Sequence, residues 1–554
     1  MRSILVIVVA GFFALTLSAQ PSWMKKASKS VFVLKTFSED GTLKGSSFGF
    51  FVGSKGEALS SYTPFRGADR AVVIGADGKE YAVAAMLGAN ETYDVAKFRV
   101  DVKKSAPLSV AADDASMGQN VWVLPYHDSK KLAQGVVRKA EKFAKEYNYY
   151  TVSVKHTAEM VGCPLMNEQG LVMGLLQESV KQGDTICYAV SARYADSLKI
   201  SGLSLNDPAL KATNIKKALP ATLDQAVLML YLGSSALDSL GYSMLVEDFI
   251  QLYPKVPDGY QYRARLAYRG NNFESARRDM ETAVKVAEKK DESHYAYSQL
   301  IYQKMLYKKQ DYEPWTLATA LEEAEKAYSI NPLPIYKRQQ ALVLFSQKQY
   351  EKACQLYEEL SHTSLRSADM FLEASACKEM LGDTLGRIAL LDSAVAMFNK
   401  PYLKETAPYL LLRAEALVSI GKYRDAVVDL NEYERLMKTR VNAQFYYMRY
   451  QAELSGRMFQ PALNDLDTAI GLQPENDLLY SEKASLLVRV GQYDKAIETA
   501  QQLITLSPGQ TDGYLFLGLA QCLKGDKKDG LLNLQKAQEM GDTQAADLIK
   551  KYAQ

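Results

Sequence analysis

The segment GSSFGFFVGSKGEALSSYTPFRGADRAVVIGADGKEYAVAAMLGANETYDVAKFRV, residues 45–100, decides the fold of the first part of the chain. Short β-rich runs alternate in it with turns built from glycine, asparagine and aspartate. The same pattern extends from about residue 28 to 200, as in NVWVLPY (120–126) and TICYAVS (185–191). Strands this short, separated by such turns, predict an all-β sandwich or barrel.

The rest of the chain has a different pattern. From about residue 222 onward, alanine, leucine and tyrosine recur at helical spacing and strand-forming runs are almost absent. Residues 201–221, SGLSLNDPALKATNIKKALPA, carry the serine, asparagine, aspartate and proline of a linker. We therefore expect an α+β multidomain protein with a β domain over residues 20–200, a linker at 201–221 and an all-α region over 222–554.

The helical region contains an internal repeat. The segments SGRMFQPALNDLDTAIGLQP (455–474), VGQYDKAIETAQQLITLSP (490–508) and KGDKKDGLLNLQKAQEMGD (524–542) align without gaps. Their small-residue positions, Ala462, Ala496 and Gly530, lie 34 residues apart. A 34-residue period with an aromatic turn residue, a small residue three positions later and a closing proline resembles the tetratricopeptide repeat (TPR). The recurring residues are Phe273, Tyr350, Tyr423, Phe459 and Tyr493; Ala276, Ala320, Ala353, Ala426, Ala462 and Ala496; and Pro332, Pro474 and Pro508.

One helix pair cannot bury its apolar face alone, so repeated pairs stack and share a continuous core. The recurring aromatic and small residues are expected to pack in that core and are not candidate sites. The resemblance implies an all-α solenoid with a C-terminal capping helix in GDTQAADLIKKYAQ (541–554). Its concave surface is expected to bind a protein or peptide partner.

The β domain resembles the HtrA-type trypsin-like proteases in the order and spacing of its motifs. Residues 48–52 occupy the first motif strand, Gly67-Ala68 a turn, Asp77-Gly78 a hairpin and Asp94-Val95-Ala96 the acid motif. The segments GVVRKAEKF (135–143), GCPLMNEQGLVMGL (162–175) and TICYAVSARYAD (185–196) match a second barrel. The resemblance implies a trypsin-like double β-barrel.

The catalytic positions of that family are altered here. Serine attack on an amide needs a hydroxyl, an imidazole that takes its proton, a carboxylate that orients the imidazole, and backbone donors for the oxyanion. Thr63 stands in the histidine position, 31 residues before Asp94 in the acid position. Val161 stands in the serine position and Glu159 in that of the oxyanion-loop glycine. We therefore expect a degenerate protease that is not an enzyme.

One fallback nucleophile is present. Cys163 lies two residues after the serine position, and His156 lies seven residues before Cys163. A working base would have to come from the first barrel, but residues 1–126 contain no histidine; His127 falls near the region between the barrels. The alternative hypothesis is an active trypsin-like serine or cysteine endopeptidase whose TPR region recruits substrate.

The N-terminus has the pattern of a secretory signal. MRSILVIVVAGFFALTLSAQ begins with one early arginine, continues with an apolar run from Ile4 to Leu17, and ends with small residues. The run is too short to span a bilayer, which needs about 20 apolar residues. We expect residues 1–19 to be removed after Ala19, leaving a periplasmic or secreted protein. No cysteine follows the run, so a lipid anchor is not expected.

The charge and the cysteine and histidine content limit the classes of partner and ligand that we expect. A formal net charge of +2 gives no long-range reason to expect nucleic acid. The five cysteines and four histidines form no zinc motif, so no metal and no cofactor are expected. No later segment is apolar enough to cross a membrane. The leading hypothesis is an exported, non-catalytic scaffold that binds proteins or peptides through the TPR surface and the barrel cleft. A complex of the cell envelope is one assembly in which such a scaffold could act.

Overall fold

The computed structural model describes residues 21–126, 132–144, 146–155, 157–177 and 185–553. The expected signal peptide (1–19) and two of the histidines named above, His127 and His156, lie outside the described residues. The chain divides into two compact units, residues 1–287 and 288–554. The expected linker at 201–221 falls within the first unit.

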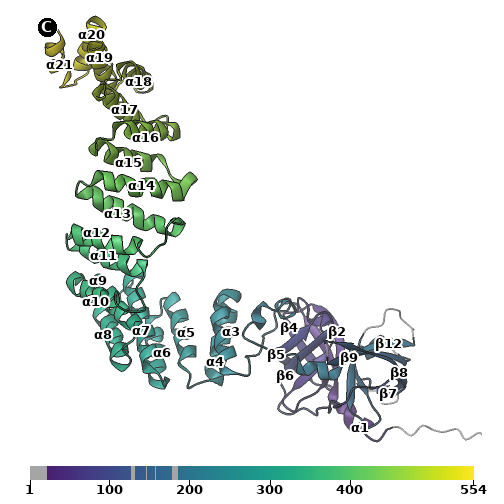
Figure 1. Ribbon diagram of the computed structural model, residues 1–554. Helices are drawn as coiled ribbons and strands as arrows, with labels where there is room; N and C mark the ends of the chain where they lie inside the picture. Colours follow the sequence, from purple (N-terminus) through teal and green to yellow (C-terminus); the bar gives the residue numbers. More distant parts are fainter. Residues whose placement is uncertain (1–20, 127–131, 145, 156, 178–184, 554) are drawn as a thin grey trace, which may run out of the picture. The chain divides into compact units, whose positions relative to one another are not determined.

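The first barrel is a closed six-stranded antiparallel sheet (Figure 1). Its order is β1-β2-β3-β6-β5-β4, and buried phenylalanines such as Phe32 and Phe98 fill its interior. Along residues 32–37, buried side chains alternate with half-buried ones, which is the pattern of a barrel wall. The strands are β1 (Val31–Phe37), β2 (Leu43–Phe51), β3 (Glu57–Ser60), β4 (Arg70–Ile74), β5 (Glu80–Asn90) and β6 (Val95–Val100).

The second barrel is also closed, in the order β10-β11-β12-β9-β8-β7 (Figure 1). Phe50, Leu59 and Val95 of the first barrel belong to the same apolar cluster as the core of the second. The two barrels therefore share a buried interface. The strands are β7 (Asn120–Val123), β8 (Ala133–Phe143), β9 (Tyr147–Val154), β10 (Pro164–Met166), β11 (Val172–Leu176) and β12 (Ile186–Ser191). The predicted double β-barrel is confirmed.

The segment before β1 is fastened to the second barrel. It contains the short helix α1 (Met24–Ala27), preceded by Trp23, whose Nε1 donates to the carbonyl of Glu168 at 3.0 Å. Gly170 has φ +76°, and a Cβ there would lie 2.4 Å from Trp23 Cγ. Glycine is therefore required in the β10–β11 turn both for its backbone and for the indole that covers it.

Residues 201–221 pack against the first barrel. The segment contains the one-turn helices η6 (Ser204–Asn206) and α2 (Pro208–Lys211). The hydroxyl of Tyr62 donates to the carbonyl of Ala209 at 2.8 Å, and the amide of Met86 donates to the carbonyl of Lys216 at 2.7 Å. Ile215 is buried in the core of the first barrel.

The helical region begins at α3 (Leu223–Ala236). Consecutive helices pack on one another within each unit, and each repeat pairs a first helix with a second (Figure 1). The first unit also holds α4 (Ser239–Leu252), α5 (Pro257–Arg269) and α6 (Phe273–Val286). The second unit holds α7 (Lys290–Tyr307), α8 (Leu317–Ile330), α9 (Pro334–Ser346), α10 (Tyr350–Leu360), α11 (Ala368–Met380), α12 (Thr384–Val395), α13 (Ala407–Ser419), α14 (Tyr423–Met437), α15 (Ala443–Ser455), α16 (Phe459–Leu472), α17 (Asp477–Arg489), α18 (Tyr493–Leu506), α19 (Thr511–Lys524), α20 (Lys527–Glu539) and α21 (Ala545–Tyr552).

The predicted small-residue positions are fully buried. The alanines at 276, 320, 353, 426, 462 and 496 are all 0% exposed. At Gly530 a Cβ would lie 2.5 Å from Cys522 Sγ of the preceding helix. Small residues stand there because the two helices of a pair approach most closely at that point. The expected all-α, TPR-like region is confirmed.

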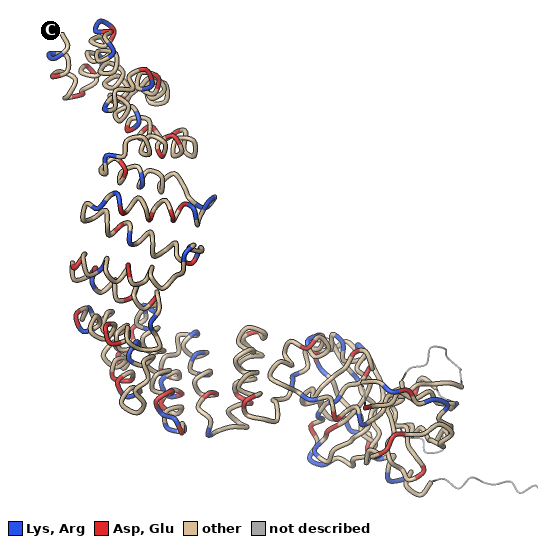
Figure 2. Tube along the Cα trace, in the orientation of Figure 1, with Lys and Arg blue, Asp and Glu red and all other residues tan. Residues whose placement is uncertain are grey.

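A second recurring contact was not predicted from the sequence. An arginine of the first helix forms two hydrogen bonds to an aspartate 16 residues later on the second helix. The pairs are Arg263–Asp279, Arg413–Asp429 and Arg449–Asp465. Figure 2 shows basic and acidic residues interspersed along the helices.

Candidate functional site

The structure brings two of the predicted site residues together. Thr63 begins the 3₁₀ turn η2 (Thr63–Phe65), and Asp94 ends the turn between β5 and β6. Asp94 Oδ1 accepts from the Thr63 hydroxyl at 2.8 Å and from the Thr63 backbone N–H at 2.7 Å. The backbone of Asp94 has φ +46°, in the left-handed region that is uncommon outside glycine. The carboxylate therefore already holds a neighbouring hydroxyl and amide at the place where it would orient an imidazole.

The loop that carries Val161 is folded back on itself. Its first part is the 3₁₀ turn η4 (Ala158–Met160), in which Glu159 is exposed. The N–H of Val161 donates to the carbonyl of Ala158 at 3.3 Å, and the carbonyl of Val161 accepts from the N–H of Phe48 at 3.1 Å. An oxyanion hole needs backbone N–H groups directed at the substrate. In this conformation the N–H of Val161 is used within the turn.

Gly162 fixes this loop against strand β2. It has φ +86°, and a Cβ there would lie 2.1 Å from the carbonyl oxygen of Phe48. Its N–H donates to the carbonyl of Leu176 at 2.8 Å. A larger residue would require both an unfavourable backbone conformation and displacement of β2.

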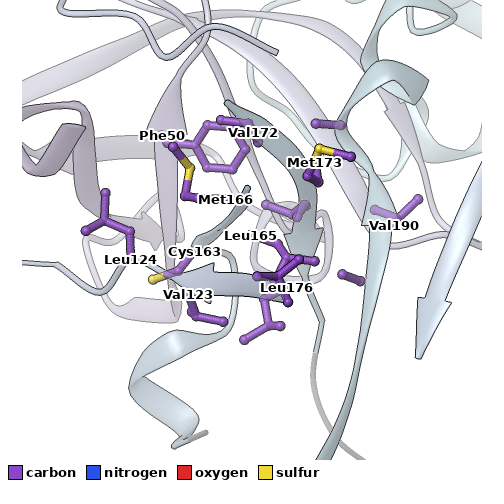
Figure 3. Packing of buried hydrophobic residues seen from close by; sticks show 14 of the residues in the cluster. Phe50, Val123, Leu124, Cys163, Leu165, Met166, Val172, Met173, Leu176 and Val190 are labelled. Atoms are coloured by element: carbon purple, nitrogen blue, oxygen red, sulfur yellow. The ribbon is translucent and has the colours of Figure 1, made fainter. Parts of the chain in front are cut away.

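Cys163 follows directly and lies in the core of the second barrel. The side chain is 0% exposed and is surrounded by Val123, Leu124, Leu165 and Leu176 (Figure 3). Burial raises the pKa of the Cys163 thiol far above its ordinary value. The thiolate is the nucleophilic form of cysteine. In the described conformation the thiol is therefore protonated and inaccessible to substrate.

A polar and aromatic bridge joins the barrels near the end of β11. The side-chain amide of Gln177 donates to the carbonyl of Tyr93, and the hydroxyl of Tyr149 donates to Gln177 Oε1 at 2.6 Å. The ring of Tyr93, beside Asp94, lies 4.2 Å from that of Phe143 and 5.4 Å from that of Tyr194. This bridge could not be predicted from the sequence, because its members are scattered between residues 93 and 194 without a local motif.

The second unit contains a buried charge cluster around Arg449. The guanidinium contacts Asp465 and Glu434 at 2.7 and 2.6 Å, and Glu453 lies 4.0 Å away. The Glu453 carboxyl is buried, and no hydrogen bond that meets the usual geometry is found for its Oε2 in the part of the chain that the structure describes. Burial, with the charge of Asp465 as a further cause, raises the pKa of Glu453 to about 8. One cation thus faces three carboxyl groups, and the protonated form of Glu453 relieves the excess negative charge.

Within the described ranges there is no group of His, Cys, Asp and Glu side chains that could hold a metal ion. The helices that the structure describes include none that is long and apolar enough to cross a membrane.

Known proteins resemble the two regions separately. Residues 47–175 match the family model of the trypsin-like peptidase domain. The small glutamine-rich tetratricopeptide repeat-containing protein 2 of Saccharomyces cerevisiae is 24% identical over 22% of this chain and 36% of its own length. The Hsp70-Hsp90 organizing protein of Triticum aestivum is 33% identical over 14% of this chain and 13% of its own. The chain thus spans about a third or less of these relatives.

Among solved structures, a protease of M. tuberculosis in its active form is 17% identical, with a TM-score of 0.29. That match covers 40% of this chain and 95% of the protease.

The prediction that the chain is not an enzyme is wrong. It rested on three side-chain positions, whereas the family match extends over residues 47–175 and points toward a protease. The chain combines a trypsin-like peptidase domain with a TPR-like helical region.

Proposed function

We propose that this chain is an endopeptidase of the trypsin-like fold whose helical region recruits protein substrates. The observation that carries the proposal is the presence of both regions in one chain. A partner held by the helical region is at high effective concentration for the peptidase domain, so recruitment raises the rate at low substrate concentration.

The proposal sets a requirement on the nucleophile. The side chain of Val161 cannot attack a carbonyl, so a different group must act in the loop. Cys163 is the thiol closest along the chain to the serine position, and its surroundings keep it protonated. For Cys163 to react, the turn at 158–162 must open, expose the thiol and bring a base to it. A recruited substrate that binds the open loop would supply the free energy for that change.

The test compares a long unfolded protein with a short peptide containing the same cleavage sequence, using the full chain. We expect both to be cut, with a lower KM for the long substrate because only it reaches the helical region. The matched variants are Cys163→Ala and Cys187→Ala, since Cys187 is a second buried thiol of the same barrel. Activity should be lost in the first and kept in the second. Equal KM values for both substrates would contradict recruitment, and absence of cleavage would contradict the peptidase.

We further propose that the protein is exported and acts in the periplasm or outside the cell. The support is the charged, apolar and small-residue pattern of residues 1–19. Amino-terminal sequencing of the protein from its natural source should find Gln20 first. An intact Met1 would contradict export by a cleaved signal.

A further inference from the structure

A pocket of 160 Å³ lies in the first unit, between residues 205–217 and helices α3 and α4. Its apolar lining includes Leu205, Met229 and Leu245, which are at most 6% exposed, and Met244, which is 47% exposed. An engineered apolar cavity of about 150 Å³ binds benzene, so this space suits a ligand portion of about six carbon atoms.

The polar edge of this pocket carries an unbalanced positive charge. Lys216 and Lys217 both line it, and Lys216 Nζ pairs with Asp248 Oδ2 at 2.5 Å. Lys217 Nζ donates to the backbone carbonyl of Thr213, and no ion pair is found for it in the part of the chain that the structure describes. Lys217 is half-buried. An ammonium group has three N–H donors, and withdrawing it even partly from water without a counter-ion costs free energy. A carboxylate in the pocket would supply the missing charge.

The backbone holds Lys217 in place. Lys217 forms a parallel bridge with Met86 of β5, and the N–H of Ala218 donates to the carbonyl of Met86 at 2.9 Å. The ammonium group is therefore presented by a segment anchored to the barrel. Burial lowers the pKa of Lys217 to about 8, which agrees with a site that lacks its anion.

We propose that this pocket binds a small carboxylate with a hydrocarbon chain of about six carbons, the carboxylate pairing with Lys217 and the chain lying against Leu205, Met229 and Met244. The site is separate from the Thr63–Asp94 region and does not depend on peptidase activity. Its ligand chemistry is common to a free carboxylic acid and to the C-terminal residue of a peptide.

Calorimetric titration of the full chain tests the proposal with three probes: hexanoate, hexanol and acetate. Hexanoate should bind about tenfold or more tightly than either of the others, because hexanol lacks the carboxylate and acetate lacks the hydrocarbon chain. Lys217→Met should weaken hexanoate about tenfold and leave hexanol unchanged, whereas Lys217→Arg should retain binding. The matched control is Lys211→Met, since Lys211 is exposed on α2 and does not line the pocket.

A second variant guards against misfolding of the first. Leu237, which directly follows α3, also lines the pocket. Leu237→Trp should block the pocket sterically while the ammonium group remains, and hexanoate binding should be lost. Equal affinity for hexanoate and hexanol, or unchanged hexanoate affinity in Lys217→Met, would overturn the proposal. A leucine-ending peptide that binds more tightly than its C-terminal amide and than hexanoate would identify the source as a peptide C-terminus. Weaker binding of that peptide than of hexanoate would identify it as a free acid.

Discussion

The double barrel and the helical region are stabilised by contacts of different range. In the helical region the same arginine–aspartate pair recurs between residues 16 apart. In the barrels, hydrogen bonds that occur once join residues 31 apart, as in Thr63–Asp94, or 145 apart, as in Trp23–Glu168. Local, repeated contacts leave a period in the sequence, whereas long-range contacts that occur once leave none. A substitution in the helical region should therefore affect mainly its own repeat, whereas the stability of the barrels should depend on contacts that single residues make.

The largest effect is expected from Arg449→Ala. The arginine side chain is 8% exposed, and its removal leaves the buried carboxyl groups of Asp465 and Glu453 without their cation. Breaking a buried ion pair in this way costs about 3–5 kcal/mol. The matched variant is Arg263→Ala, which removes the same contact where the side chain is 35% exposed. Urea unfolding should show a smaller loss there, because Asp279 is buried but its guanidinium partner is partly exposed to water, and equal losses at both positions would contradict the role of burial.

The barrel counterpart is Gly162→Ala. The new methyl group would meet the Phe48 carbonyl at 2.1 Å in a left-handed backbone conformation, so we expect a loss of about 2–4 kcal/mol. Gly118→Ala is the control, because Gly118 has φ +85° but no atom within 4 Å of the added Cβ. It should cost about 1 kcal/mol from the backbone alone. If thermal melting shows the two variants equally destabilised, β2 does not hold the loop as described.

The Glu453 carboxyl should make the stability of the helical region depend on pH. Its pKa is raised from the ordinary 4.5 to about 8 in the folded protein. Its stabilising contribution is therefore fully present below pH 4.5 and is lost as the pH rises through 8. The free energy of unfolding in urea should be larger at pH 5 than at pH 8.5 by about 4 kcal/mol, and Glu453→Gln should abolish this difference. Glu475→Gln, at an exposed position, should keep the full difference, and a wild-type difference that survives in Glu453→Gln would place its origin elsewhere.

The smallest effect is expected at Thr63. Thr63→Val removes the hydroxyl donor to Asp94 and leaves the backbone N–H donor in place, so the loss should be about 0.5–1 kcal/mol. Thr92→Val, an exposed change near the same turn, serves as the control and should cost less. A cost at Thr63 no larger than at Thr92 would show that the hydroxyl does not contribute to holding Asp94.

The sequence separation of the contacts explains which features could be predicted from the sequence and which could not. The period of Ala462, Ala496 and Gly530 predicts the helical pairs, because each repeat needs a small residue where its two helices approach most closely. The strand and turn pattern predicts an all-β sandwich or barrel, and only the resemblance to trypsin-like proteases implies two barrels. The sequence also placed Thr63 near Asp94 through the spacing of the family motif. It could not show the burial of Cys163, the internal bond of the Val161 N–H, or the Gln177 bridge, because each depends on strands far apart in the chain.

The most direct test of the account is whether a recruited protein opens the loop at Cys163. Thiol labelling of the full chain, followed by peptide mass spectrometry, measures the rate at Cys163 with and without an unfolded substrate protein. We predict that Cys163 is labelled slowly in the free protein and about tenfold or more faster with substrate. The labelling rate of Cys187 in the same barrel should not change. A rate at Cys163 that is unaffected by substrate, or that rises only together with Cys187, would contradict substrate-linked opening of the peptidase site.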